Sequence, residues 1–157
     1  MTTQLEGLDI LDLAIQTEVR GEAFYRRAAQ LAADPDAVQL FSSLADQEVA
    51  HKRIFEELAR ESSVGDVSGP DWDELREYIA ATVDRSFFQE SSAIRSIPAA
   101  ASLAEMIARA ISFEKETLLF FYELRDLVRA ADRGTLDDVV SEEKRHIRRL
   151  AALLADR

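Results

Sequence analysis

Apolar residues recur along the chain with a period of three to four positions, which is typical of helices that bury one face. The pattern predicts four long helices and a less regular stretch between the second and the third. The helices are expected at about residues 8–33, 36–61, 102–129 and 132–155, and the irregular stretch at 62–101, with a short amphipathic helix at about 71–83. The expected fold class is therefore all-α.

The breaks between the predicted helices indicate how they pack. Asp34 and Pro35 end the first helix and begin the second, because Asp is a good N-cap and Pro is tolerated in the first helical turn. This break and the break before the fourth helix are short, so each pair of helices should form an antiparallel hairpin. Residues 62–101 are long enough to run back along a helix of ~39 Å. One long crossover between two hairpins is the ferritin-like arrangement of a four-helix bundle, expected here as a single domain over residues 1–157.

Charge and composition narrow the function. The 157 residues include 19 basic and 30 acidic side chains, and the net charge of −11 repels nucleic-acid phosphates and anionic lipid surfaces. No uncharged stretch is long enough to span a membrane, and no basic residue precedes Arg20, so we expect a cytoplasmic protein that binds neither nucleic acid nor membrane. The absence of cysteine excludes disulfides, iron–sulfur sites and Cys-ligated zinc. Any metal must be held by oxygen and imidazole.

Both histidines of the chain are preceded by a glutamate at the same distance. The pairs are Glu48 with His51 and Glu143 with His146. Three residues are close to one helical turn, so both side chains of a pair lie on one face and can bind one object. The probability that both pairs arise by chance is about 1%, given how common glutamate is here. Carboxylate and imidazole together suit iron or manganese better than calcium or a structural zinc site.

A degenerate internal duplication supplies two more carboxylates. A shift of 96 residues aligns the first helix with the third, and a shift of 95 aligns the two Glu-x-x-His pairs. The first shift pairs Glu18 with Glu114, each on an otherwise apolar face. A dinuclear metal site inside a four-helix bundle takes one carboxylate from each of two helices and a Glu-x-x-His pair from each of the other two. The sequence therefore predicts six ligands around two metal ions: Glu18, Glu48, His51, Glu114, Glu143 and His146. Two Fe(II) would neutralise the four carboxylates among them.

The ligand register also predicts where the second hairpin turns. In the first hairpin, the turn at Asp34 and Pro35 lies midway along the sequence between Glu18 and the pair of Glu48 and His51. Adding the shifts of 95 and 96 residues to that turn places the second turn at residues 129–131. Gly134, where a helix would ordinarily end, comes later. A turn at Gly134 would stagger Glu114 and Glu143 by ~5 Å, too far for one metal pair with ligand bonds of ~2 Å. We therefore predict that the third helix ends near residue 129 and that Gly134 lies inside the fourth.

Four segments resemble the helices of the rubrerythrin branch of the ferritin-like di-iron proteins. They are ILDLAIQTEVRGEAFY, SSLADQEVAHKRIFEEL, AISFEKETLLFFYEL and VVSEEKRHIRRLAALL. The resemblance covers residues 1–61 and 102–157 and implies a dinuclear iron site. In that site Glu18 and Glu114 would be single-carboxylate ligands, Glu48 and Glu143 would bridge the metals, and His51 and His146 would each be the terminal ligand of one metal.

Two departures from full rubrerythrins bear on the activity. Those proteins have a Cys-ligated rubredoxin iron domain that delivers electrons, and they have a further Glu one turn after the third-helix ligand, where this chain has Thr117. Glu22, one turn after Glu18, is a candidate for an extra carboxylate. Tyr25, two turns after Glu18, is a candidate to hydrogen-bond a ligand or to donate an electron, although aromatic residues at this spacing are usually core.

The function expected from these features is that of an oxidoreductase. Two iron ions would reduce hydrogen peroxide or oxygen and would be re-reduced by an external electron-donor protein. The alternatives are a protein that oxidises and sequesters iron, and a bundle that keeps a metal such as manganese or zinc without turnover. A homodimer is also expected, because the crossover carries a large apolar load: Trp72, Tyr78, Phe87, Phe88 and Ile94.

Overall fold

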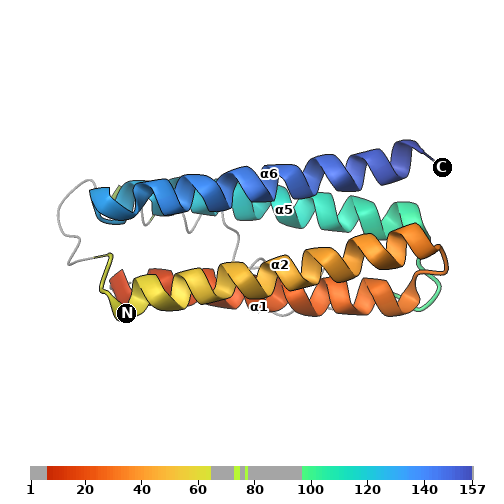
Figure 1. The fold of residues 1–157 in the computed structure, drawn as a ribbon, viewed down its shortest axis with the longest axis horizontal. Coiled ribbons are helices and arrows are strands. Elements are labelled where there is room, and N and C mark those ends of the chain that lie inside the picture. Colours follow the sequence, from red (N-terminus) through yellow and green to blue (C-terminus); the bar gives the residue numbers. More distant parts are fainter. Residues whose placement is uncertain (1–6, 65–72, 75–76, 78–96, 157) are drawn as a thin grey trace.

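The chain forms long helices, and no strand occurs in the part that the structure describes. The computed structural model describes residues 7–64, 73–74, 77 and 97–156. Its helices are α1 (Gly7–Leu31), α2 (Pro35–Arg60), α5 (Leu103–Leu127) and α6 (Arg133–Ala155), with a 3-10 turn, η1 (Ala130–Asp132), between α5 and α6 (Figure 1). These are the four long helices that the apolar pattern predicts.

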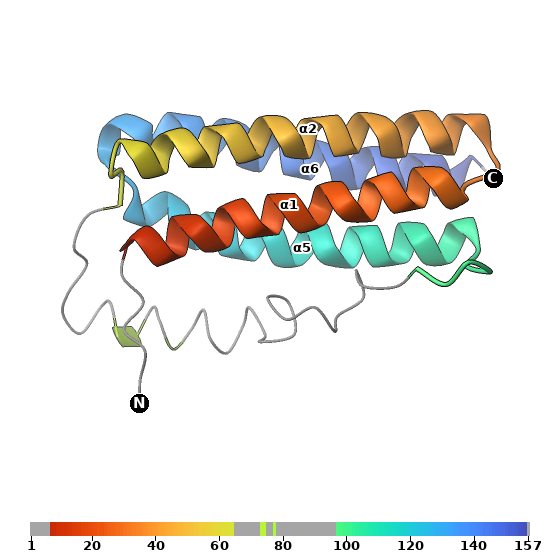
Figure 2. The same ribbon diagram turned by 90° about the horizontal axis from the view of Figure 1, so that it is seen from below.

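The helices form two antiparallel hairpins that lie side by side. Helix α1 packs along α2, and α5 packs along α6 (Figure 1). The hairpins meet where α1 lies beside α5 and α2 lies beside α6, as the second view shows (Figure 2). Each helix therefore presents one face to the centre of the bundle, and the expectation of an all-α four-helix bundle is confirmed.

Helix starts follow the local signals in the sequence. The Asp34 carboxylate accepts hydrogen bonds from the backbone N–H groups of Asp36 (2.9 Å) and Ala37 (3.4 Å), and Pro35 occupies the first turn of α2. Helix α5 begins with a capping box, in which the Ser102 hydroxyl and the Glu105 side chain each accept from the other residue's backbone N–H. These caps set where α2 and α5 begin and so set the phase of their inner faces.

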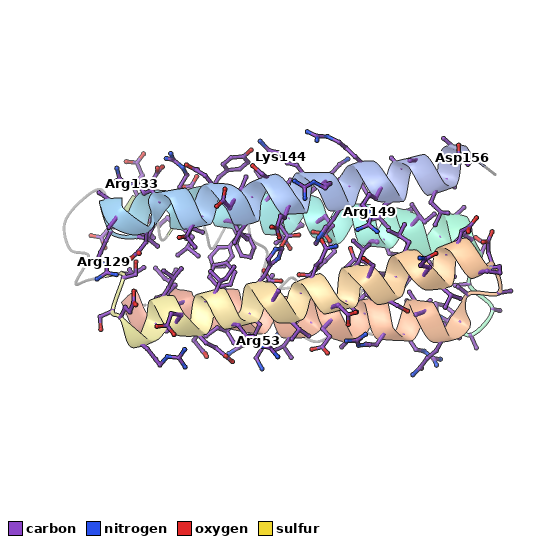
Figure 3. The ribbon with its side chains drawn as sticks, viewed as in Figure 1. Arg53, Arg129, Arg133, Lys144, Arg149 and Asp156 are labelled. Atoms are coloured by element: carbon purple, nitrogen blue, oxygen red, sulfur yellow. The ribbon has the colours of Figure 1, made fainter. Side chains whose placement is uncertain are left out.

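The connection between α5 and α6 lies where the ligand register predicts it. Helix α5 ends at Leu127, and Gly134 is the second residue of α6. The Asp132 carboxylate accepts from the Ser63 hydroxyl (2.6 Å) and from Arg129 Nε (2.8 Å), and the Arg129 backbone N–H donates to the Ser63 carbonyl (2.9 Å) (Figure 3). Contacts with the end of the first hairpin therefore hold this turn, and they outweigh the preference of glycine for a helix end.

The apolar core consists of two clusters with a polar layer between them. One cluster fills the end of the bundle near the α5–α6 connection, and the other fills the end near the α1–α2 turn. Along α1, α2 and α6, the predicted ligands come between residues of one cluster and residues of the other, and on α5 Glu114 directly follows Phe113, where the first cluster begins. The first cluster includes Ile10, Phe55, Phe120, Phe121 and Leu136, and the second includes Phe24, Phe41, Leu44, Ile107 and Leu150.

Two expectations fall outside the described residues. The short helix predicted at about 71–83 lies there almost entirely, and so do the apolar residues on which the expected homodimer rests: Trp72, Tyr78, Phe87, Phe88 and Ile94. Within the described part of the chain, none of the helices combines the length and the apolar content that a bilayer-spanning segment needs.

Candidate metal centre

The polar layer of the bundle contains all six predicted ligands. Helices α1 and α5 contribute one glutamate each, whereas α2 and α6 contribute a Glu-x-x-His pair each, with both members on the inner face as their spacing requires. Each of the six residues is at most 1% exposed. We call them the ligand cluster: Glu18, Glu48, His51, Glu114, Glu143 and His146.

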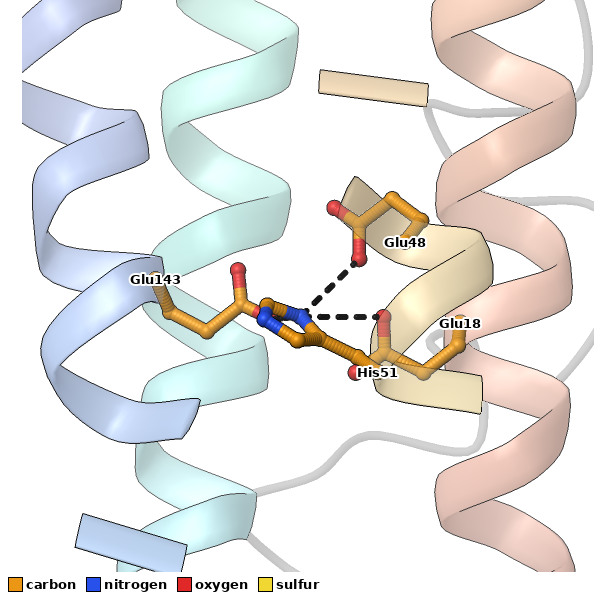
Figure 4. Close-up of side chains that lie close together, drawn as sticks. All are labelled: Glu18, Glu48, His51 and Glu143. Carbon is orange, nitrogen blue, oxygen red and sulfur yellow. Dashed lines mark hydrogen bonds and ion pairs between the residues drawn. The ribbon is translucent and has the colours of Figure 1, made fainter. Parts of the chain in front are cut away.

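The ligand cluster divides into two groups that share two members. The first ligand group is Glu18, Glu48, His51 and Glu143, and each residue offers a ligand atom within 4.8 Å of those of the others (Figure 4). The second ligand group is Glu48, Glu114, Glu143 and His146, by the same criterion. Because Glu48 and Glu143 belong to both groups, they lie where carboxylates could bridge two ions.

The imidazole rings have the same orientation toward the cluster. His51 Nδ1 lies 2.9 Å from a Glu143 oxygen and 3.8 Å from oxygens of Glu18 and of Glu48. His146 Nδ1 lies 2.9 Å from the other Glu143 oxygen and 3.2 Å from Glu114. The two rings stack with their centroids 5.8 Å apart. Each ring therefore presents Nδ1 to the carboxylates of the ligand cluster and turns Nε2 away from the cluster.

The donor set fits a pair of cations. Among the described residues, Glu18, Glu48 and Glu114 each have a buried carboxylate oxygen without a hydrogen-bond partner, whereas the two oxygens of Glu143 each lie 2.9 Å from a histidine Nδ1. Buried carboxylates without partners are costly, and the four carboxylates in this layer repel one another. Two divalent ions would satisfy these oxygens and neutralise the four charges. The unpartnered oxygens are Glu18 Oε1, Glu48 Oε1 and Glu114 Oε2.

The electrostatics of the ligand cluster show the same demand for positive charge. Burial, together with the charges of Glu48 and Glu143, raises the pKa of Glu18 well above its usual range, and burial together with Glu143 and Glu48 does the same for Glu114. Burial lowers the pKa of His51, but hydrogen bonds to Glu143 and Glu48 prevail and raise it to about 11. The cluster therefore attracts protons, which bound metal ions would displace.

Tyr25 contacts the cluster, as the sequence suggested. Its hydroxyl donates a hydrogen bond of 2.5 Å to Glu114 Oε1 across the bundle. The ring is fully buried, with Phe24 edge-on at 5.4 Å and Phe41 stacked at 6.3 Å between centroids. Burial and the charge of Glu114 raise the pKa of Tyr25 well above its usual value, so the phenol keeps its proton next to a ligand.

The structure does not place Glu22 in the centre. Its side chain is 33% exposed and lies 3.6 Å from Arg26 on the same helix, and neither ligand group found in the described residues includes it. The physical reason is its position on the helix, at the surface beside Arg26, which also pairs with Asp46 at 2.9 Å. Thr117 is fully inside the bundle, 1% exposed, and its hydroxyl has no hydrogen-bond partner among the described residues. Among the described residues, neither ligand group therefore contains a carboxylate in place of the one that Thr117 lacks.

Three neighbours of the ligands were missed by reasoning from the sequence. Glu142 Oε2 lies 2.6 Å from His51 Nε2, and Gln47 Oε1 lies 2.6 Å from His146 Nε2. Both residues directly precede the glutamate of a Glu-x-x-His pair, so the 95-residue shift aligns them and was the available signal. Gly21, one turn after Glu18, is the third, because a Cβ there would lie 3.1 Å from Glu48 Cδ.

Comparisons with known proteins identify the family. A sequence model of the Rubrerythrin family matches residues 9–154, nearly the whole chain. The chain belongs to the rubrerythrin family. This rubrerythrin-family chain is similar to a solved structure, that of a ferritin-like diiron-carboxylate protein from Thermotoga maritima. The two share 28% sequence identity and a TM-score of 0.72, and the match covers 94% of this chain and 93% of that one. A comparison with curated proteins gave no match. The ferritin-like fold and the family expected from the sequence are thereby confirmed.

Proposed function

We propose that this chain is a dinuclear-iron oxidoreductase that reduces hydrogen peroxide or oxygen with electrons from an external donor protein. The observation that carries the proposal is the pair of buried ligand groups that share Glu48 and Glu143. Two ions that share ligands in a layer closed off by apolar clusters are suited to a reaction that needs two electrons at one place.

Iron is the metal that the donor set and the family favour. Carboxylate and imidazole ligands without thiolate suit iron and manganese. The Thermotoga maritima protein is named for a diiron-carboxylate centre, and its fold extends over nearly the whole of this chain. Glu18 and His51 would hold one ion, Glu114 and His146 would hold the other, and Glu48 and Glu143 would contact both.

The residues of the chain position and isolate the metal pair. When bound, two ferrous ions supply the two electrons that reduce a peroxide or oxygen bond. The apolar clusters on both sides of the ligand cluster exclude bulk water from the layer. The Tyr25 hydroxyl oxygen lies 2.5 Å from Glu114 Oε1 and donates a hydrogen bond that stabilises that carboxylate in its place. The chain has no cysteine for an iron–sulfur or rubredoxin-type relay, so electrons would come from a separate donor.

Metal analysis paired with a peroxide-consumption assay tests this proposal. Protein purified without added metal should contain about two irons per chain, and it should consume peroxide only when a reductant is supplied. Glu143→Gln should lose both metal and activity, because Glu143 serves both ligand groups. Asp138→Asn makes the same chemical change on the exposed side of α6 and should lose neither.

Two results would overturn the proposal in different ways. A two-iron protein that consumes neither peroxide nor oxygen in the presence of reductants would be a metal-binding bundle without turnover. Many irons per chain inside a large closed shell would instead make the protein an iron store. Full metal content and activity in Glu143→Gln would show that the ligand cluster is not the site of the reaction.

A further inference from the structure

The two histidines of the ligand cluster differ in what holds their outer nitrogens. His51 on α2 is paired through Nε2 with the carboxylate of Glu142 on α6. His146 on α6 is paired through Nε2 with the amide oxygen of Gln47 on α2. Both distances are 2.6 Å, so the arrangement is reciprocal in geometry and unequal in charge. The internal duplication of the chain is broken at this pair of positions.

The amide of Gln47 is oriented by its own partners. Its nitrogen lies 3.4 Å from the Ser43 hydroxyl, which also accepts a hydrogen bond at 3.3 Å from Arg149, the residue labelled on α6 in Figure 3. Because the amide nitrogen donates to Ser43, the amide oxygen is the atom that faces His146. An oxygen there requires a proton on His146 Nε2, which leaves the lone pair of Nδ1 directed at the carboxylates.

Tyr25 breaks the duplication a second time. The 96-residue shift aligns Tyr25 with Phe121, which has no hydroxyl. Glu114 therefore accepts a hydrogen bond from a phenol, and the matching position offers no such donor to Glu18. A hydrogen bond to a carboxylate oxygen draws electron density away from it and makes it a weaker metal ligand.

Both differences act in the same direction. A carboxylate acceptor on the outer nitrogen makes an imidazole a stronger donor than a neutral amide does, because the hydrogen bond is assisted by charge. The first ligand group, with Glu18 and His51, therefore has the stronger donors. The second ligand group, with Glu114 and His146, has the weaker ones. Glu48 and Glu143 are common to both groups and do not distinguish them.

We propose that Glu142 and Gln47 are positioning residues that make the two metal positions unequal, so that the first ligand group binds its ion more tightly and fills first. This inference rests on the proposed dinuclear centre. Replacing an outer partner of a metal-bound histidine typically changes metal affinity by about 10- to 100-fold. The two binding steps should therefore differ by about 10-fold or more.

Titration of metal-free protein with Mn²⁺, followed by calorimetry, tests the proposal without any turnover. The unmodified protein should bind two ions in two resolved steps. Glu142→Gln gives His51 the same kind of partner that His146 has, so it should weaken the tight step by about 10-fold or more and leave the weak step unchanged. Gln47→Glu should tighten the weak step instead. The double exchange should reverse the contribution of the histidine partners, so the two steps should lie closer together than in the unmodified protein, and adding Tyr25→Phe should reverse which ligand group fills first.

The controls separate this inference from a general effect of charge. Asp138→Asn removes a carboxylate from the exposed face of α6, one turn before Glu142, and should change neither step. Tyr25→Phe frees the Glu114 oxygen and should tighten the weak step. Helix content of each variant, measured by circular dichroism, shows whether it folds. If Glu142→Gln does not fold, Gln47→Glu still tests the proposal through a change of opposite sign.

Each outcome has one meaning. Two steps of equal affinity in the unmodified protein would overturn this inference and leave the dinuclear centre intact. An equal loss at both steps in Glu142→Gln, or no change in Gln47→Glu, would also overturn it. No binding of Mn²⁺ at the ligand cluster would instead overturn the proposed dinuclear centre.

Discussion

Gly21 on α1 leaves room for the side chain of Glu48, and replacing it with alanine tests how precisely that carboxylate must be placed. A Cβ at position 21 would lie 3.1 Å from Glu48 Cδ, 3.3 Å from Glu48 Cγ and 3.1 Å from Phe113 Cε1. The shortest of these separations are about 0.4 Å below the nearest favourable distance between carbon atoms. Because both separations are equally short, both Glu48 and Phe113 must move by a comparable amount.

The expected loss of metal affinity in Gly21→Ala follows from how small a displacement of a ligand atom a metal site can accommodate. Ligand distances in metal sites hold to within about 0.2 Å, so a displacement of about 0.4 Å exceeds what the site accommodates. Glu48 belongs to both ligand groups, so both metal positions should weaken, by about 10-fold or more. The helix itself would gain about 1 kcal/mol from alanine, and the crowding at Glu48 and Phe113 opposes that gain.

Gly134→Ala provides the matched control. Gly134 also lies within a helix, but a Cβ there would have no neighbour within 4 Å. This variant should raise the stability of the protein by up to about 1 kcal/mol, a rise in Tm of about 2–4 °C, and should leave metal affinity unchanged. Thermal unfolding of metal-free protein and Mn²⁺ titration measure the two quantities. Unchanged Mn²⁺ affinity in Gly21→Ala would refute the reasoning, and so would an equal stabilisation by both variants.

Three further results are expected. Asp132→Ala removes the acceptor for the Ser63 hydroxyl and Arg129 Nε at the α5–α6 connection. It should lower the free energy of unfolding, measured in urea, by about 1–2 kcal/mol. No change would show that these hydrogen bonds do not hold the turn. Burial lowers the pKa of His51, but its carboxylate partners raise it to about 11, so the stability given by its proton is complete below pH 6.5 and is lost as the pH rises toward 11. Unfolding of metal-free protein should show this loss and metal-loaded protein should not, whereas identical pH profiles would contradict it. Light scattering should show a homodimer at micromolar concentration, and a monomer would count against the apolar crossover as an interface.

Much of the fold and the ligand cluster could be predicted because the local capping signals agree with the need to hold the metal ligands of neighbouring helices at one level. The caps at Asp34 and Ser102 are set by neighbours two or three residues away, and the structure shows them where the sequence indicates. The end of α5 is different, because glycine alone would place it at Gly134. The need to keep Glu114 level with Glu143 gave the right answer there, and Ser63 supplies the contact that enforces it.

The neighbours of the ligands could not be predicted because they depend on how far each helix is rotated. Gln47 and Glu142 contact histidines that are 99 and 91 residues away in the sequence, on the helix facing their own. The spacing of a motif places its own residues on one face, but it does not say which side chains of the opposite helix reach the outer nitrogens. The space at Gly21 likewise depends on how closely α1 approaches Glu48.

A crystal structure of protein purified with its own metal, with anomalous scattering measured at the iron absorption edge, is the most direct test of the dinuclear centre. Two iron peaks should appear about 3.5–4 Å apart. One should lie against His51 Nδ1, the other against His146 Nδ1, and Glu48 and Glu143 should contact both. A single peak, a metal other than iron, or iron bound outside these residues would contradict the proposed di-iron centre.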